Sequence, residues 1–199
     1  MGISLDLLEF NQEINPFYQN TLRAEKINIF HYPEAKRIAS IWATVAREKE
    51  KLATTLSEKE QFSSCAGISE AMASSLSWPQ FYQDIYVCKD SYGNFQGMMK
   101  IAMNTDEVYI ALLVTNPINI RSPVNAEEWK KVSGAGTTLL HKAEELAIQK
   151  DKTSLRLHPL ESAVEFYKKN GFVFDGWSMR KVIQQPKEDF IWEFSGLIA

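Results

Sequence analysis

A glycine-containing turn in front of a helical pattern is the segment of this sequence best suited to binding chemistry. The stretch KVSGAGTTLLHKAEELA (131–147) leads from a polar loop into an amphipathic pattern. Gly134 and Gly136 let the main chain approach a bulky anion with no Cβ in the way. The first N–H groups of a helix lack internal partners, and the helix dipole adds partial positive charge there. The segment is therefore a candidate diphosphate site.

The turn does not match the other common phosphate-binding patterns. The dinucleotide fingerprint needs a third glycine three residues after Gly136, where Leu139 stands. A Walker loop needs Gly-Lys-Ser/Thr after four intervening residues, and the turn does not contain it. A lone G-x-G turn is also compatible with a tight connection that has no function. The order and spacing of the motifs around the turn are therefore more informative than the turn itself.

Four motifs follow one another in a recognisable order. They are LLVTNP (112–117), KVSGAG (131–136), LHP (157–159) and SAVEFYKKNGF (162–172). Together they resemble the GCN5-related N-acetyltransferase (GNAT) family. The resemblance covers residues 26–198 in the order of the elements, and its specific motifs lie within residues 107–175.

Two patterns of the family carry the resemblance. The first is an Arg/Gln-x-x-Gly-x-Gly/Ala turn, which Lys131, Gly134 and Gly136 fill with Lys in place of Arg or Gln. The second is an Ala-x-x-x-Tyr-x-x-x-Gly-Phe helix, which is filled without a gap by Ala163, Tyr167, Gly171 and Phe172. These matches predict a diphosphate turn and a following helix of the family type.

The sequence departs from the family at two places. INIRSPVNAEEWK (118–130) separates Pro117 from the glycine turn, where the family has only a few residues. Long loops of this kind are often lids or binding loops, although a solvated excursion costs little closure entropy. Leu160 stands where the family has an Asn that contacts the pantetheine arm. We expect the insertion either to cover the cofactor or the acceptor, or to be a solvated loop without a function.

The resemblance implies an α/β fold, with a splayed central mixed β-sheet flanked by helices. Residues 1–24 are expected to form an N-terminal extension and residues 25–199 a single acyltransferase domain. The sequence patterns predict strands at 26–32, 84–90, 95–104, 107–117, 154–159, 176–184 and 189–196. They predict helices from Pro33 to Leu56, at 69–78 after a break at 62–69, at 139–150 and at 161–170. The strand at 107–117 is expected to be buried on both faces.

The resemblance also implies a co-substrate, acetyl-CoA or another short acyl-CoA, and no metal. Main-chain groups of Leu113, Val114 and Thr115 would hold the pantetheine arm between two splayed strands. The alternative for these three residues is a plain core strand. The diphosphate would be held at the turn made by Lys131, Val132, Ser133, Gly134, Ala135, Gly136 and Thr137.

Acyl transfer to an amine needs a proton donor and a proton acceptor. Tyr167 is the candidate acid, because a phenol within hydrogen-bond reach can protonate the departing thiolate. Its alternative role is packing against Ala163 on the same helix face. His158 and Glu107 are the candidate bases, and His158 could instead cap its strand.

Composition excludes several other classes of protein. A net charge of −3 and a pI near 5.7 argue against a nucleic-acid partner, which would need a basic excess. No apolar run approaches the ~18 residues of a membrane span. The two cysteines lack metal-ligand spacing, and the first residues lack a signal-peptide pattern, so we expect a cytoplasmic protein. The alternating set Trp177, Phe190, Trp192 and Phe194 is interpreted as core or as a contact between copies, which leaves a homodimer open.

Three functions are compatible with these patterns. The favoured one is transfer of an acetyl group from acetyl-CoA to an amine of a small molecule or a protein. A non-catalytic acyl-CoA sensor on the same fold is the first alternative, and the intact Tyr167 argues against it. A nucleotide-phosphate enzyme is the second, and it lacks the Lys-Ser/Thr that its turn would need.

Overall fold

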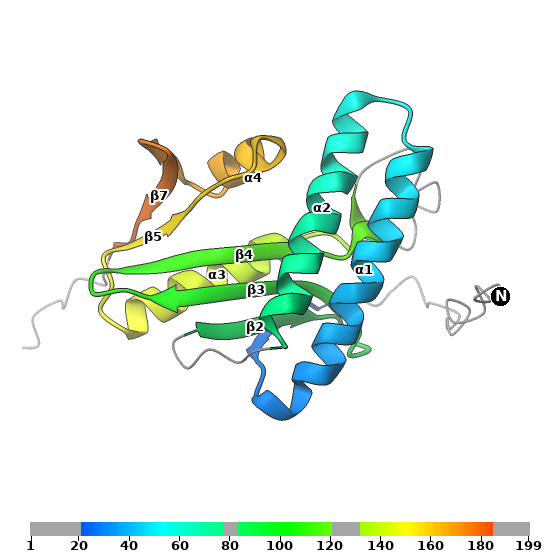
Figure 1. Ribbon diagram of the computed structural model, residues 1–199. Coiled ribbons are helices and arrows are strands. Elements are labelled where there is room, and N and C mark those ends of the chain that lie inside the picture. Colours follow the sequence, from blue (N-terminus) through cyan, green and yellow to red (C-terminus); the bar gives the residue numbers. More distant parts are fainter. Residues whose placement is uncertain (1–20, 78–82, 121–131, 185–199) are drawn as a thin grey trace, which may run out of the picture.

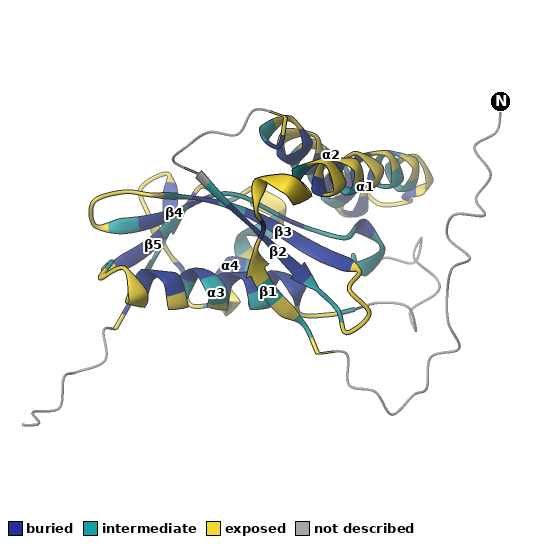
Figure 2. Cartoon of the chain, turned by 90° about the horizontal axis from the view of Figure 1, so that it is seen from below, coloured by how far each residue is buried: buried dark blue, intermediate teal, exposed yellow. Residues whose placement is uncertain are grey.

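The computed structural model describes residues 21–77, 83–120 and 132–184. Within them a seven-stranded open sheet has the order β1-β2-β3-β4-β5-β7-β6. The strands are β1 (Arg23–Lys26), β2 (Gln83–Lys89), β3 (Phe95–Met103), β4 (Glu107–Thr115), β5 (Ser154–Leu157), β6 (Val173–Asp175) and β7 (Ser178–Val182). The helices are α1 (Tyr32–Leu52), α2 (Leu56–Ser75), α3 (Ala135–Gln149) and α4 (Val164–Lys169). Helices α1 and α2 cover one face of the sheet, and α3 and α4 lie on the other (Figures 1 and 2).

The sheet is mixed, as the sequence predicts. Strands β4 and β5 are parallel, and every other neighbouring pair is antiparallel. The predicted hairpin of β2 and β3 is confirmed, and its turn places Gly93 at φ 84°. A side chain at such a φ is strained, so glycine suits this position.

The first strand differs from the prediction. It spans Arg23–Lys26, and Ile29–His31 form a 3₁₀ turn where a strand was expected at 26–32. The Asn28 side chain accepts a hydrogen bond from the N–H of Phe30 at 3.0 Å, which stabilises this turn. Pro33 lies in the first turn of the following helix, as predicted. Strand β1 crosses the expected boundary, between residues 24 and 25, that separates the N-terminal extension from the acyltransferase domain.

The boundary between the first two helices was also wrong. The chain breaks at Ala53–Thr55, and the predicted break at 62–69 lies inside α2. Thr55 and Glu58 form a capping box, in which each side chain bonds the other residue's main-chain N–H. Gly67 is tolerated inside α2, where an added Cβ would meet nothing within 4 Å. The capping signal was present in the sequence, and the apolar periodicity concealed it.

Strand β4 is confirmed, but its burial on both faces is incomplete. Val108, Ile110 and Val114 are buried, whereas the residues between them are half-buried. Two apolar cores meet at the sheet. Ile110 belongs to the core on the α3 side and Val114 to the core under α1 and α2.

The last part of the described chain forms a hairpin that the sequence predicts only in part. Strand β7 lies within the predicted strand at 176–184, and β6 was not anticipated. Trp177 lies in the turn between them and is 94% exposed, so it is not a core residue. The strand predicted at 189–196 lies outside the described residues.

Candidate cofactor and acceptor site

Strands β4 and β5 separate halfway along β4. Their pairing joins Glu107–Ile110 to Ser154–Leu157, and β4 then continues alone to Thr115. The divergence begins at a bulge, because Ala111 has no partner between the pairs that β4 makes with β3 on either side. Figure 1 shows β5 turning away from β4 in this region. We call the opening beyond Ile110 the β4–β5 gap.

Two of the three predicted pantetheine residues direct main-chain groups into this gap. The N–H of Asn116 donates to the carbonyl of Gln96 on β3 at 3.0 Å. Because successive residues of a strand direct their N–H and C=O groups to opposite sides, those of Val114 also face β3. The main-chain groups of Leu113 and Thr115 therefore face away from β3, toward the gap. The Thr115 carbonyl accepts a hydrogen bond from Sγ of Cys65 on α2 at 3.6 Å, so its N–H is the group of Thr115 that remains for a ligand.

The turn before α3 has the geometry of an anion site. Gly134 caps α3 at φ 95°, and no side chain caps the helix. The first intrahelical bond runs from the N–H of Thr138 to the Gly134 carbonyl at 2.8 Å. In the part of the chain that the structure describes, the N–H groups of Ala135, Gly136 and Thr137 have no hydrogen-bond acceptor. This leaves a row of donors at the positive end of the helix dipole.

One predicted donor of this turn is already used. The N–H of Val132 donates to Oδ1 of Asn119 at 2.9 Å, and Nδ2 of Asn119 donates to Oε1 of Gln96 at 3.0 Å. Asn119 ends the 3₁₀ turn Pro117–Asn119, so it ties the start of the insertion to the glycine turn. Sequence analysis missed Asn119, since only the fold brings it to Val132. Lys131 lies outside the described residues, and Ser133 is exposed beside the donors.

The two glycines of the turn serve different purposes. Gly134 supplies a positive φ, as predicted. Gly136 makes room for α4, because a Cβ there would lie 2.9 Å from Cζ of Phe166 and 3.6 Å from Cγ2 of Thr115. The prediction that Gly136 lets the main chain approach an anion stays a prediction, and the structure adds a packing role. Its missing side chain lets α4 pack beside the helix start and the end of β4.

This packing places Tyr167 near the gap. Its side chain is buried, 8% exposed, and its ring lies edge-on to Phe172 with centroids 5.8 Å apart. Burial raises the pKa of the Tyr167 phenol to about 12, so it stays protonated at neutral pH. A thiolate with a pKa of roughly 8.5 is a weaker base than this phenolate. The phenol is thus better suited to donating a hydrogen bond to a departing sulfur than to complete proton transfer.

His158 lies at the end of β5 and has a tyrosine partner. Its Nδ1 is 2.9 Å from the hydroxyl of Tyr109, and the two rings meet at 67°. The register pairs Tyr109 with Arg156, so His158 is its diagonal neighbour on the same face. If Nδ1 carries the proton and the tyrosine oxygen accepts it, Nε2 keeps a free lone pair. His158 is exposed, so that nitrogen can meet solvent or a substrate.

Glu107 is not brought to the gap. It begins β4 and forms an ion pair with Arg156, with Oε2 and Nε 2.8 Å apart. Arg156 also contacts Asp175 at 3.1 Å and Ser178 at 2.9 Å. Strand geometry puts Glu107 roughly 13 Å along β4 from the bulge at Ala111. The structure assigns it to a charge network at the far end of the strand pair.

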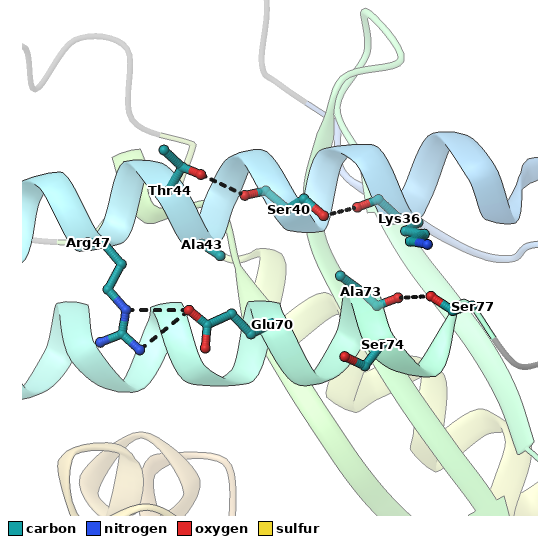
Figure 3. A pocket seen from close by; sticks show the side chains of 9 residues that line it. All are labelled: Lys36, Ser40, Ala43, Thr44, Arg47, Glu70, Ala73, Ser74 and Ser77. Atoms are coloured by element: carbon teal, nitrogen blue, oxygen red, sulfur yellow. Dashed lines mark hydrogen bonds and ion pairs between the residues drawn. The ribbon is translucent and has the colours of Figure 1, made fainter.

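A cavity adjoins the gap on the α2 side. Its volume is about 310 Å³, and its walls are Ser63, Ser64, Gly67, Ile68, Ala71, Leu112 and Leu160. Leu160, which replaces the family's Asn, is thus part of an apolar wall. A larger cavity of about 470 Å³ lies between α1 and α2, and only residues of these helices and Ser77 line it (Figure 3). It does not reach β4 or β5, so we assign the chemistry to the smaller cavity.

Two searches of the described residues gave no further site. No group of three His, Cys, Asp or Glu side chains there is arranged to hold a metal ion. No helix among them is long and apolar enough to cross a membrane.

Comparison with known proteins defines the fold. No family model matches the sequence, and no curated protein matches it either. A GCN5-related N-acetyltransferase from Rhodopseudomonas palustris aligns with a TM-score of 0.53 and 19% identity, over 85% of this chain and 100% of that one. The PaiA N-acetyltransferase of Thermoplasma acidophilum, solved in complex with coenzyme A, has a TM-score of 0.52 and 16% identity, over 81% and 99% of the chains. The ribosomal-protein-S18-alanine N-acetyltransferase of Escherichia coli has a TM-score of 0.50 and 15% identity, over 85% and 99%. The chain therefore has the fold of the GCN5-related N-acetyltransferases.

Proposed function

We propose that this protein is an acyl-CoA-dependent N-acyltransferase that transfers acetyl from acetyl-CoA to an amine. The observation that carries the proposal is the β4–β5 gap, which opens at Ala111 toward the uncapped start of α3. A strand edge with free main-chain groups suits the amides of pantetheine, and a helix start with free N–H groups suits a diphosphate. The fold shared with N-acetyltransferases, one of them solved with coenzyme A, supports the same assignment.

The cofactor would be held mainly by main-chain groups. The main-chain groups of Leu113 and the N–H of Thr115 would bond the pantetheine arm, and the N–H groups of Ala135, Gly136 and Thr137 would bond the diphosphate. Asn119 would hold the turn in shape without touching the ligand. Because these contacts come from the backbone, affinity depends on backbone conformation more than on side-chain identity.

The reaction is a direct attack of the amine on the thioester. The amine nitrogen forms a bond to the carbonyl carbon, the tetrahedral intermediate collapses, and the carbon–sulfur bond breaks. The amine loses a proton and the coenzyme A sulfur gains one. We assign the amine proton to Nε2 of His158, which is held by Tyr109. The sulfur leaves as a thiolate that accepts a hydrogen bond from the phenol of Tyr167 and takes its proton from solvent, so the phenol itself stays protonated.

The cavity beside α2 is the proposed acceptor site. It borders Leu112, which follows the bulge, and Leu160, which follows His158 and Pro159. An amine in this cavity would approach the thioester from the face opposite α3. Attack and cofactor binding would thus use opposite sides of the same sheet.

Binding and turnover test the proposal separately. Isothermal titration calorimetry with acetyl-CoA, coenzyme A and ATP should show binding of the first two and none of ATP alone. Thiol release from acetyl-CoA should then increase when amines are added. Binding without amine-dependent thiol release would indicate an acyl-CoA sensor. Lack of binding by every short acyl-CoA and by coenzyme A would overturn the proposal.

A further inference from the structure

One lysine on the acceptor side of the sheet bonds a hydroxyl, whereas the other lysines of the described strands pair with carboxylates. Lys100 lies on β3 directly opposite Leu112 and is half-buried. Its Nζ donates to Oγ of Ser75 on α2 at 3.0 Å, which fixes the side chain on the α2 face. Burial lowers the pKa of this amine from its ordinary value.

The other lysines of the described strands are paired with carboxylates, among them Lys89, which meets Glu25 at 2.8 Å. Lys26 meets Asp84 at 2.7 Å, and Lys181 meets Glu144 at 2.6 Å. Among the described residues no carboxylate lies within ion-pair distance of Lys100. A partly desolvated cation loses hydration free energy. A neutral hydroxyl partner does not offset this loss as an opposite charge would. The site therefore favours an anion from outside the described chain.

Lys100 does not itself line the acceptor cavity, but its neighbours connect it to the cavity wall. Residues of α2 spaced by about one turn face this side, and they are Ser64, Gly67, Ile68, Ala71 and Ser75. All of them except Ser75 line the cavity, and Ser75 continues the same stripe by one turn to Lys100. Leu112, a wall of the cavity, is the direct cross-strand neighbour of Lys100. The amine and the cavity therefore lie next to each other on the α2 face of the sheet.

The α2 face of the sheet also carries His158, the proposed proton acceptor, on the side away from Lys100. Ala102, two residues after Lys100, pairs with Tyr109, which holds His158. The strands β3 and β5 are two strand spacings apart, roughly 10 Å. Between them the lining of the cavity is uncharged. The surface thus has a cation at one end and a proton acceptor at the other.

We propose that the acceptor is a small amine that also carries a carboxylate, and that Lys100 binds this carboxylate while the amine lies near His158. The proposal rests on the proposed function, since it names the substrate class of that same site. Polycationic acceptors are disfavoured, because a second ammonium group would meet Lys100. Lys100 acts as a specificity-determining residue, and it does not take part in bond making.

The test compares acids with their esters. Thiol release from acetyl-CoA is measured for linear amino acids from glycine to aminohexanoate and for the methyl ester of each, which keeps the amine and removes the carboxylate. Lys100→Met keeps the length of the side chain and removes the charge. Lys36→Met is the matched control, because Lys36 is exposed on α1 away from the gap. Lys100→Arg keeps the charge and should retain the preference for acids.

The wild-type protein should show a lower KM for at least one acid than for its ester. Lys100→Met should raise that KM about 10- to 100-fold, the value expected for a lost charged hydrogen bond, with no change for esters or acetyl-CoA. Equal losses for acid and ester, or an unchanged KM in folded Lys100→Met, would overturn the proposal.

Binding separates failure of this inference from failure of the proposed function. The same acids are tested by saturation-transfer NMR on protein saturated with coenzyme A. Acid binding that Lys100→Met abolishes supports the inference even without turnover. If coenzyme A binds and no acid does, the inference fails and the proposed function stands. If coenzyme A itself does not bind, the proposed function fails.

Discussion

The two sides of the β4–β5 gap are built by different means. The α3 side, where we place the cofactor, uses main-chain groups and one short segment, from Gly134 to Thr137. The α2 side, where we place the acceptor, uses side chains that lie far apart in the sequence. Lys100 meets Ser75 across 25 positions, and Tyr109 meets His158 across 49.

This difference matches the roles of the two sides: cofactor binding is common to proteins of this fold, and acceptor binding differs from one protein to another. Acyl-CoA always brings the same diphosphate and pantetheine groups, so a backbone site can serve many proteins of one fold. The acceptor varies, and side chains on a shared scaffold can be exchanged without disturbing the backbone. Substitutions on the α3 side should therefore affect cofactor binding, and those on the α2 side should affect the acceptor.

The largest effect is expected at Gly134. Valine would be strained at φ 95°, so the turn that presents the N–H groups of α3 would change its conformation, and its Cβ would meet Leu22 at 3.6 Å. Gly134→Val should weaken coenzyme A binding by about 100-fold or more, or about 2.7 kcal/mol, as measured by calorimetry. Gly93→Val is the control, because its φ of 84° imposes similar strain in the hairpin far from the gap. Normal affinity in folded Gly134→Val would reduce the turn to a connector.

The next effect belongs to Tyr167. Phenylalanine removes the hydroxyl and little volume, so Tyr167→Phe should lower turnover by about 100-fold, the lower end for a lost proton donor. Affinity for coenzyme A should hardly change. Tyr86→Phe is the control, because burial raises the pKa of that buried tyrosine on β2 to about 12 as well. Equal rates in the Tyr167 variant and the wild type would leave this residue a packing role only.

A smaller effect is expected on the acceptor side. His158→Gln should lower turnover by at least about 10-fold through loss of the proton acceptor. Tyr109→Phe should lower it less and should change the pH profile of kcat/KM, because only the hydrogen bond to Nδ1 is lost. The exposed Tyr92 provides a control as Tyr92→Phe. A Tyr109 variant with an unaltered pH profile would show that the pair has no part in proton transfer.

Asn119 tests whether the shape of the turn matters. Asn119→Ala removes the bonds to Val132 and Gln96, and it leaves the N–H of Val132 without its partner. Coenzyme A affinity should fall roughly 2- to 10-fold, the range for one neutral hydrogen bond. The acceptor KM should stay the same. A higher acceptor KM with unchanged coenzyme A affinity would instead mean that Asn119 supports the acceptor site on the α2 side.

The smallest effect is a loss of stability at alkaline pH that both sides share. Burial raises the pKa of Tyr167 to about 12 and that of the Cys65 thiol to about 11, from their ordinary values of 10.0 and 9.0. A group whose pKa is raised on folding contributes its full stabilisation at pH values below its pKa in the unfolded chain. This stabilisation is lost as pH rises through the pKa of the group in the folded protein. The Tm should therefore decline as pH rises from about 9 to 12. Tyr167→Phe and Cys65→Ser should each flatten part of the decline, and a Tm independent of pH over this window would contradict the burial of these groups.

Much of the α3 side could be predicted from sequence, because its determinants are local. A glycine turn, a helix and the Ala-x-x-x-Tyr-x-x-x-Gly-Phe pattern lie within short stretches. Gly171 at φ 84° ends the second helix as predicted. The packing role of Gly136 could not be predicted, since only the packed structure shows Phe166 against it.

The α2 side could be predicted far less well. The break between α1 and α2 was misplaced because the small apolar residues of both helices form one continuous pattern across a three-residue link. Glu107 was a candidate base by its residue type, and its ion pair with Arg156 depends on a strand 49 positions later. Tyr109, Asn119 and Lys100 carried no signal at all, because each matters through a partner distant in sequence.

The sequence by itself determined a mixed sheet, most of the order of its elements and the glycine turn, because periodicity, turn residues and helix starts are encoded within a few residues of one another. Tertiary structure alone decided where β4 and β5 separate and which side chains meet there. The bulge at Ala111 depends on the register between β3 and β4, and register depends on how both apolar cores pack at once. The acceptor surface is a product of that packing, and so Lys100, Tyr109 and His158 acquire a shared face only when the chain folds.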